Sequence, residues 1–183
     1  MRQRVALLKV FGWGLLALLA ACGPAKQPDA RITLNAAGIS LQLPPHWQAG
    51  LAGDYTLLSA HPLDAAGQAV PGAVFFIERD LSPSAPGVPA LTAYAEARAA
   101  SIQSLSQELR QLQQTDTLLD AQPAVSVLRE YSDTTGSYRE LAVMVVRGHL
   151  GYSFVGRTRP ADFERLQPDI QSILDGVRWI PAK

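Results

Sequence analysis

Apolar and polar residues alternate in short runs beyond residue 30, which is the two-residue period of a strand with one buried face. The runs that this pattern predicts as strands are residues 32–34, 39–43, 55–60, 73–79, 124–131, 138–147, 150–157 and 177–180. Only the turn-forming segments 133–136 and 148–149 separate the three runs between 124 and 157, so these are expected to form an antiparallel meander. Residues 82–89 contain three prolines and are predicted to be a surface loop.

Two segments carry apolar residues at the three- and four-residue spacing of helices. The first spans residues 90–113, and its stripe consists of Leu91, Tyr94, Ile102, Leu105, Leu109 and Leu112. The second spans residues 160–175 and is expected to bury Phe163, Leu166, Ile170, Ile173 and Leu174. Pro168 should kink or restart the second helix, because its ring clashes with the preceding turn. Gly176 is placed to cap its end.

Arg98 is a charged residue on or beside the apolar stripe of the first helix, because it lies seven positions from both Leu91 and Leu105. A partly buried guanidinium needs a partner. We expect its stem to lie along the sheet and its head to reach a strand carboxylate or a backbone carbonyl. The alternatives are a head group that extends to water at the edge of the stripe and one that binds a ligand anion. The candidate carboxylates are Glu78, Glu130 and Glu140.

Residues 141–146 are apolar at every position, which predicts a strand that is covered on both faces. The elements together predict an α+β fold in which helices cover both faces of an antiparallel sheet. A chain of 183 residues leaves room for one domain, which we place at residues 31–183.

Residues 1–21 have the layout of a secretory signal peptide, with a basic start and an apolar run from Val10 to Ala21. A transmembrane helix is the alternative, but it needs about 20 apolar residues and Lys9 leaves only a dozen uninterrupted. The run ends in Leu19, Ala20, Ala21 and Cys22, which resemble the lipobox of bacterial lipoproteins. Cys22 is the only cysteine, so it has no partner for an intramolecular disulfide.

The lipobox resemblance implies cleavage before Cys22 and a diacylglycerol thioether, so that acyl chains such as palmitate anchor the protein to a membrane. Residues 22–30 would then be a short tether that keeps the domain near the membrane surface. Gly23 occupies the position where an Asp favours inner-membrane retention in enterobacterial-type sorting. This implies a location in the cell envelope at the outer membrane, facing the periplasm.

Charge and motifs argue against several classes of function. The leader contributes three basic residues, and without it 13 basic residues face 16 acidic ones, which leaves no basic patch for nucleic acid. The motifs of serine hydrolases, phosphate-binding loops and zinc proteases do not occur. The sequence therefore predicts no catalytic residue, no metal site, no cofactor and no nucleic-acid partner.

The remaining chemically interesting residues have simpler interpretations. The histidines are expected at separate, solvated turns; they are His46, His61 and His149. Glu78 and Asp80 are interpreted as a solvated strand edge, and Asp162 and Glu164 as complements of a helix dipole. Trp47 and Trp179 are predicted to close opposite ends of the core with their N–H groups bonded at its rim. An exposed tryptophan binding surface is the alternative.

Three segments together resemble the PsbP/DcrB-like family of small α/β/α sandwiches. Residues 39–47 are similar to its opening strand, proline turn and tryptophan; residues 152–155 to its last hairpin; and residues 163–179 to its final helix and strand. Gly176 departs from the family pattern, in which a serine is commoner. Members of this family are largely binding and assembly factors, so the resemblance implies a non-enzymatic accessory role.

The resulting hypothesis is a non-catalytic envelope lipoprotein that binds or helps assemble another envelope protein, whose identity the sequence does not give. One alternative is a holdase-like chaperone for apolar segments, which requires a contiguous exposed apolar groove. The other is a hydrolase, which requires convergent polar residues in a pocket.

Overall fold

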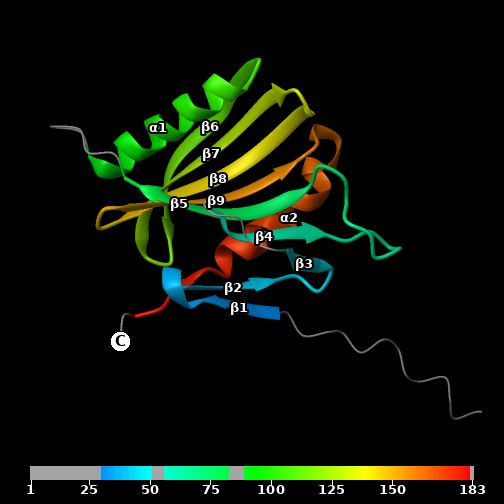
Figure 1. Ribbon diagram of the computed structural model, residues 1–183, viewed down its shortest axis with the longest axis horizontal. Coiled ribbons are helices and arrows are strands. Elements are labelled where there is room, and N and C mark those ends of the chain that lie inside the picture. Colours follow the sequence, from blue (N-terminus) through cyan, green and yellow to red (C-terminus); the bar gives the residue numbers. More distant parts are fainter. Residues whose placement is uncertain (1–29, 51–55, 83–88, 182–183) are drawn as a thin grey trace, which may run out of the picture.

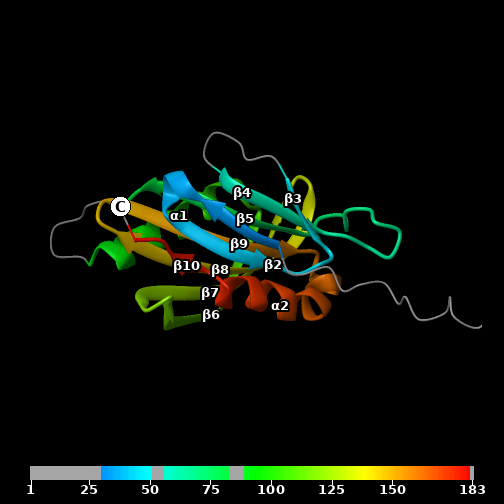
Figure 2. The same ribbon diagram turned by 90° about the horizontal axis from the view of Figure 1, so that it is seen from below.

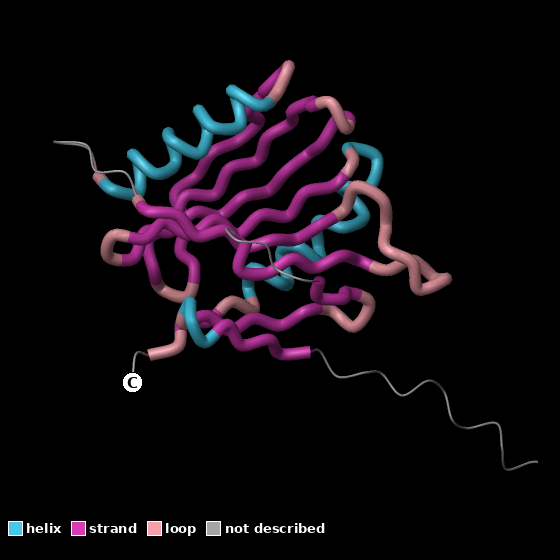
Figure 3. The backbone as a smooth tube through the Cα atoms, in the orientation of Figure 1, coloured by secondary structure: helices cyan, strands magenta, loops and turns pink. Residues whose placement is uncertain are grey.

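The computed structural model describes residues 30–50, 56–82 and 89–181. Strands dominate the described part of the chain, and two α-helices accompany them (Figures 1 and 3). The strands are β1 (Ala30–Leu34), β2 (Ile39–Leu43), β3 (Trp47–Gly50), β4 (Thr56–Pro62), β5 (Val74–Leu81), β6 (Glu108–Leu119), β7 (Gln122–Asp133), β8 (Gly136–Arg147), β9 (Leu150–Thr158) and β10 (Arg178–Trp179). The helices are α1 (Ala90–Leu105), α2 (Pro160–Asp175) and a 3-10 turn, η1 (Asn35–Ala37).

The strands form two antiparallel sheets. The large sheet has seven strands in the order β3-β4-β5-β9-β8-β7-β6, and the small sheet has the order β1-β2-β10. The meander predicted for residues 124–157 is confirmed, because β7 pairs with β8 and β8 with β9 through tight turns. The order also brings β5 next to β9, although about 70 residues separate them in sequence.

Two apolar clusters hold the elements together. The larger one joins both sheets to α2, with Ile39, Phe75, Val143, Phe154 and Ile170 fully or almost fully buried. Figure 2 shows α2 beside the large sheet near β2 and β10. The smaller cluster joins Tyr94 of α1 to three residues of β7 and β8, which are Val125, Val127 and Met144. The antiparallel α+β architecture is therefore confirmed.

Helix α1 is shorter than the periodicity predicts. It ends at Leu105, and residues 108–113 belong to β6 rather than to the helix. The N–H of Gln107 already donates to the carbonyl of Ser132, so pairing with β7 replaces the helical hydrogen bonds from this point. Leu105 is 76% exposed, and Leu112 lies on the edge strand. The predicted stripe is therefore wrong beyond Ile102.

Helix α2 has the predicted boundaries, and its five buried residues are those predicted from the spacing. It continues through Pro168 without a restart. Gly176 ends the helix in a right-handed conformation, and its N–H donates to the carbonyl of Ser172 at 3.0 Å.

Two short strands differ from the prediction. The predicted strand 177–180 is reduced to β10, which pairs with β2. β3 was not predicted, and it pairs with β4 at the edge of the large sheet. Trp47 and Trp179 do bond at the rim of the core, as expected: their indole N–H groups donate to Asp169 and to the carbonyl of Leu119, each at 3.3 Å.

Candidate functional site

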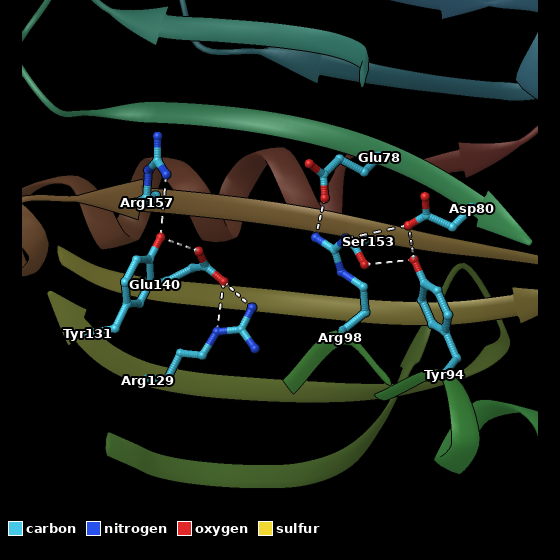
Figure 4. A network of polar contacts seen from close by, with 9 residues as sticks. All are labelled: Glu78, Asp80, Tyr94, Arg98, Arg129, Tyr131, Glu140, Ser153 and Arg157. Atoms are coloured by element: carbon cyan, nitrogen blue, oxygen red, sulfur yellow. Dashed lines mark hydrogen bonds and ion pairs between the residues drawn. The ribbon is translucent and has the colours of Figure 1, made fainter. Parts of the chain in front are cut away.

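Polar side chains line up across four neighbouring strands on the face of the large sheet beneath α1 (Figure 4). The register places Arg157 of β9 opposite Glu140 of β8, and Glu140 opposite Arg129 of β7. In the same way, Glu78 of β5 lies opposite Ser153 of β9. Residues directly opposite each other point to the same face, so these strands bring the side chains into one layer.

The first group of contacts fixes α1 to β5. Arg98 forms ion pairs with Glu78 and, at 3.4 Å, with Asp80. Tyr94, one turn earlier on the helix, shares a hydrogen bond of 2.9 Å with Ser153. Its hydroxyl also donates to Asp80 at 3.5 Å. The predicted environment of Arg98 is confirmed, with Glu78 as the expected partner and Asp80 as an additional one.

The other two candidate partners of Arg98 are occupied elsewhere. Glu140 pairs with Arg129, and Glu130 pairs with Arg139 at 2.5 Å. The interpretation of Glu78 and Asp80 as a solvated strand edge is wrong, because both hold Arg98. Of the second carboxylate pair, Asp162 lies in the first turn of α2, as predicted.

The second group of contacts is almost completely buried. Arg129 and Glu140 are 3% and 2% exposed, and the Arg129 Nε donates to Glu140 at 2.9 Å. The Tyr131 hydroxyl donates to the other oxygen of Glu140 at 3.2 Å. This hydroxyl also accepts a hydrogen bond of 3.4 Å from Arg157. Both charges of the Arg129–Glu140 pair are therefore neutralised within the sheet.

Arg157 is held mainly by aromatic rings. Its guanidinium lies 4.8 Å from the ring centre of Tyr138 and 5.7 Å from that of Phe76. No carboxylate of the described residues forms a salt bridge with it. Burial alone would lower the pKa of Arg157. The hydrogen bond to Tyr131 and the negative charge of Glu140 outweigh this effect and raise the pKa above its usual value, so the side chain stays cationic.

The two buried phenols remain neutral over a wide pH range. Burial raises the pKa of Tyr94 to about 12, and the hydrogen bond from Ser153 only partly opposes this effect. Burial also raises the pKa of Tyr131 to about 12, and the neighbouring Glu140 carboxylate adds to the shift. Both tyrosines therefore act as hydrogen-bonding groups rather than as bases near neutral pH.

A cavity of about 260 Å³ lies between the two groups of contacts. Its lining residues are Phe76, Glu78, Arg98, Ser101, Ile102, Leu105, Ser106, Tyr131, Asp133, Glu140 and Arg157. Three buried polar atoms of this lining have no hydrogen-bond partner among the described residues, namely Nε of Arg98, Nε of Arg157 and Oγ of Ser106. Buried polar atoms are rarely left unsatisfied, so this cavity is the strongest candidate site for a polar ligand.

The arrangement in this cavity suits binding better than catalysis. Its lining contains neither histidine nor cysteine. Two of its three carboxylates are held by arginines, and Asp133 accepts hydrogen bonds from the N–H groups of Thr135 and Gly136 in the β7–β8 turn. These hydrogen bonds, that of the Thr135 hydroxyl first, lower the pKa of Asp133. A general base needs a free lone pair directed at the substrate, and each of these carboxylates has at least one oxygen engaged by the protein.

The histidines lie at separate places. His46 contacts Asp169 at 2.7 Å at an exposed site. His61 lies within 3.3 Å of the Ser59 hydroxyl, and its other ring nitrogen lies 3.1 Å from the carbonyl of Ala73. His61 is part of β4 rather than of a turn, so that prediction is wrong for it. Within residues 30–50, 56–82 and 89–181, no group of three metal-binding side chains comes together.

The residues of the predicted lipid anchor, Leu19, Ala20, Ala21 and Cys22, lie outside the described residues. Most of the predicted loop 82–89 does so too. None of the helices in the described part of the chain combines the length and the apolar character that a membrane crossing requires.

Sequence reasoning missed Arg129, Tyr131 and Arg157 as site residues. The available signal was weak: Arg129 and Tyr131 occupy alternate positions of β7, and Arg157 lies near the end of β9, but both strands contain other polar residues as well. Such alternation predicts a face but not a partner, because pairing across strands depends on the register.

Comparison with known proteins supports the fold but gives no family. No family model matches the sequence, and neither does any curated protein. Among solved structures, the cyanobacterial PsbP protein CyanoP from Synechocystis is similar with a TM-score of 0.60 and 9% identity, over 88% of this chain and 98% of CyanoP.

Two further structures are similar to this chain. PA94 from Pseudomonas aeruginosa, a protein of unknown function, has a TM-score of 0.54 and 17% identity, over 85% of this chain and 98% of its own. LpqN, which is involved in cell envelope biogenesis of Mycobacterium tuberculosis, has a TM-score of 0.56 and 12% identity, over 84% of this chain and 86% of LpqN. At these identities the similarity defines the fold alone: the described domain has a PsbP-like fold.

Proposed function

We propose that this protein is a non-catalytic accessory factor of the bacterial cell envelope, which binds or helps assemble an envelope partner. The observation that carries the proposal is the state of the cavity beneath α1. Its carboxylates are engaged by arginines or by a turn, while three of its polar atoms lack partners. This combination favours recognition of a ligand over proton transfer.

The PsbP-like fold is consistent with such a role, since LpqN, which is involved in cell envelope biogenesis, has a similar fold. We also infer the full α/β/α arrangement. Tyr94 of α1 lies over Gly151, and Ile170 of α2 lies over Gly156. These glycines are five positions apart on β9, and residues an odd number apart point to opposite faces of a strand. The two helices would then cover opposite faces of the large sheet.

Attachment to a membrane is the second part of the proposal. Residues 19–22 have the lipobox pattern, and Cys22 is the only cysteine. Lipid chains on Cys22 would hold the domain at the outer membrane, facing the periplasm, and the short segment 22–30 would limit its distance from the lipid surface. A factor that binds a membrane-embedded partner gains effective concentration from such a tether.

The chaperone alternative finds less support in the distribution of exposed apolar side chains. Four large ones are exposed among the described residues: Leu81, Leu105, Leu112 and Leu118. β5 and β6, which carry Leu81 and Leu118, are separated by three other strands. A holdase needs one contiguous patch, and Leu81 and Leu118 do not lie in the same one.

Complementation of a deletion strain tests the proposal. Wild-type protein should restore the phenotype, whereas the same domain exported with a cleavable leader that lacks the lipobox should restore it only weakly at native expression. Crosslinking in intact cells should capture an envelope protein with the anchored form. Full rescue by the untethered domain would show that membrane attachment is irrelevant.

Replacement of Cys22 tests the anchor separately. Cys22→Ser should abolish incorporation of labelled fatty acid and leave the precursor uncleaved, because the lipid transfer that precedes cleavage needs the thiol. The wild-type chain, labelled in parallel, is the control. A normally cleaved, membrane-bound Cys22→Ser product would contradict the lipoprotein assignment.

A further inference from the structure

Arg157 differs from the other two arginines beneath α1, because it forms no salt bridge with a carboxylate of the described residues. Arg98 is neutralised by Glu78 and Asp80, and Arg129 by Glu140. Among the described residues, the Tyr131 hydroxyl accepts a hydrogen bond of 3.4 Å from Nη1 of Arg157, and the buried Nε of Arg157 has no partner. Figure 4 shows its guanidinium at the end of the chain of contacts that runs through Tyr131 and Glu140.

From these contacts we propose that the cavity beneath α1 binds the carboxylate of a small organic acid with an apolar stem, and that Arg157 holds the carboxylate. This inference rests on the proposed binding function and adds the chemical class of the ligand. An anion suits this place because a partly buried cation without a carboxylate partner gains most from a charged acceptor.

The surroundings of Arg157 favour a planar anion. The ring centres of Tyr138 and Phe76 lie 4.8 and 5.7 Å from the guanidinium carbon. The guanidinium can therefore donate further hydrogen bonds only in the plane of its N–H groups. A carboxylate matches this geometry, since it can accept two parallel hydrogen bonds from one guanidinium. The Ser106 hydroxyl, which is buried without a partner in the lining, can donate a further hydrogen bond.

The size and the walls of the cavity define the rest of the ligand. A volume of about 260 Å³ corresponds to roughly eight or nine water molecules at about 30 Å³ each. This is enough for a short aliphatic or aromatic acid and too little for a whole phospholipid. Phe76, Ile102 and Leu105 supply an apolar wall, which a free inorganic anion would leave uncovered.

Calorimetric titration of the full chain in detergent tests this inference, with hexanoate and benzoate as probes. Both should bind, whereas hexanol, which has the stem without the charge, and inorganic phosphate, which has the charge without the stem, should bind at least tenfold more weakly. Equal affinity for hexanol would overturn the role of the carboxylate. Equal affinity for phosphate would overturn the role of the apolar wall.

Variants locate the site. Arg157→Gln should weaken hexanoate binding at least tenfold, whereas the matched charge change Arg110→Gln, on an exposed residue outside this cavity, should change it less than twofold. Arg157→Lys keeps the charge but loses the two-point contact, so this variant should bind hexanoate with intermediate affinity. It replaces Arg157→Gln in the test if Arg157→Gln does not fold. Unchanged affinity in a folded Arg157 variant overturns the proposal. Binding of no probe also overturns it, while rescue of the deletion strain still tests the accessory function.

Discussion

At the scale of single residues, partnered charges dominate the layer beneath α1. Arg129 and Glu140 are both nearly inaccessible, and their pairing leaves Tyr131 to satisfy the second carboxylate oxygen. Removing one member of such a pair leaves a buried charge without compensation. The polar layer is therefore expected to tolerate paired substitutions better than single ones.

The contact between Arg98 and Glu78 provides a quantitative test. Arg98→Met should lower the free energy of unfolding by about 1–3 kcal/mol, because it leaves Glu78 and Asp80 partly buried without their cation. Adding Glu78→Gln should cost less than the two single changes would predict, since the residues contact each other. Urea unfolding of the wild type, the two single variants and the double variant measures this coupling. Strict additivity would indicate that the pair contributes nothing.

The buried phenols predict how stability depends on alkaline pH. The pKa values of Tyr94 and Tyr131 are raised from 10.0 to about 12 in the folded protein. Their contribution to stability is therefore complete below pH 10 and is lost as pH rises towards 12. In the double variant Tyr94→Phe/Tyr131→Phe, the free energy of unfolding should fall less between pH 9 and 11.5. The loss of two late-titrating groups from the tyrosinate absorbance is the check; normal titration of both would contradict the burial argument.

At the scale of elements, glycines in β9 determine how closely the helices approach the sheet. A side chain at Gly151 would overlap the ring of Tyr94 on α1, and one at Gly156 would overlap Ile170 on α2. Both positions lie within a regular strand, so the reason for glycine is the close packing and not the backbone conformation.

Alanine at these positions should therefore be destabilising. Gly151→Ala and Gly156→Ala should each lower the free energy of unfolding by about 1–3 kcal/mol or more, because the overlying helix must move. Gly50→Ala is the matched control, since the nearest atom to an added Cβ there lies 3.5 Å away and φ is not positive. Thermal unfolding compares the three. Near-wild-type stability of Gly156→Ala would refute the packing argument.

The end of α1 shows why the boundary between helix and strand was missed. Glutamine and leucine suit both structures, and β6 is an edge strand whose side chains are exposed on both faces. It therefore has no two-residue pattern of buried positions that the sequence could reveal. Only the hydrogen bonds to β7 decide that residues 108–119 are extended.

At the scale of the whole molecule, the two helices are held very differently. Five residues of α2 are buried, four of them in the large apolar cluster, whereas only Ala93 and Tyr94 of α1 are buried. Much of the attachment of α1 comes from polar contacts through Tyr94 and Arg98. Segments with few buried apolar contacts open at lower free energy than the core does.

Hydrogen exchange should reveal this difference. The backbone amides in the middle of α1 should exchange at least ~10-fold faster than those of α2, because local opening of α1 exposes little apolar surface. Arg98→Met should accelerate exchange in α1 and leave α2 unchanged. Exchange of both helices at the same rate would mean that α1 opens only with the whole domain.

The sequence alone predicts the elements whose burial follows a regular period. The meander from β7 to β9 and the five buried residues of α2 have such a period, because one face of each element packs against the core. It also identified Arg98 as a charge that needs a partner, since a cation on an apolar stripe conflicts with its surroundings.

Which residues form the site depends on the tertiary fold. Arg129, Glu140 and Arg157 come from three strands, and Phe76 and Ile102 come from β5 and α1. Their proximity follows from the strand order β5-β9-β8-β7 and from its register, which long-range hydrogen bonds determine. A one-residue shift of β9 would turn Arg157 to the opposite face of the sheet. Local residue patterns cannot encode such pairing, because the contacts join segments that are distant in sequence.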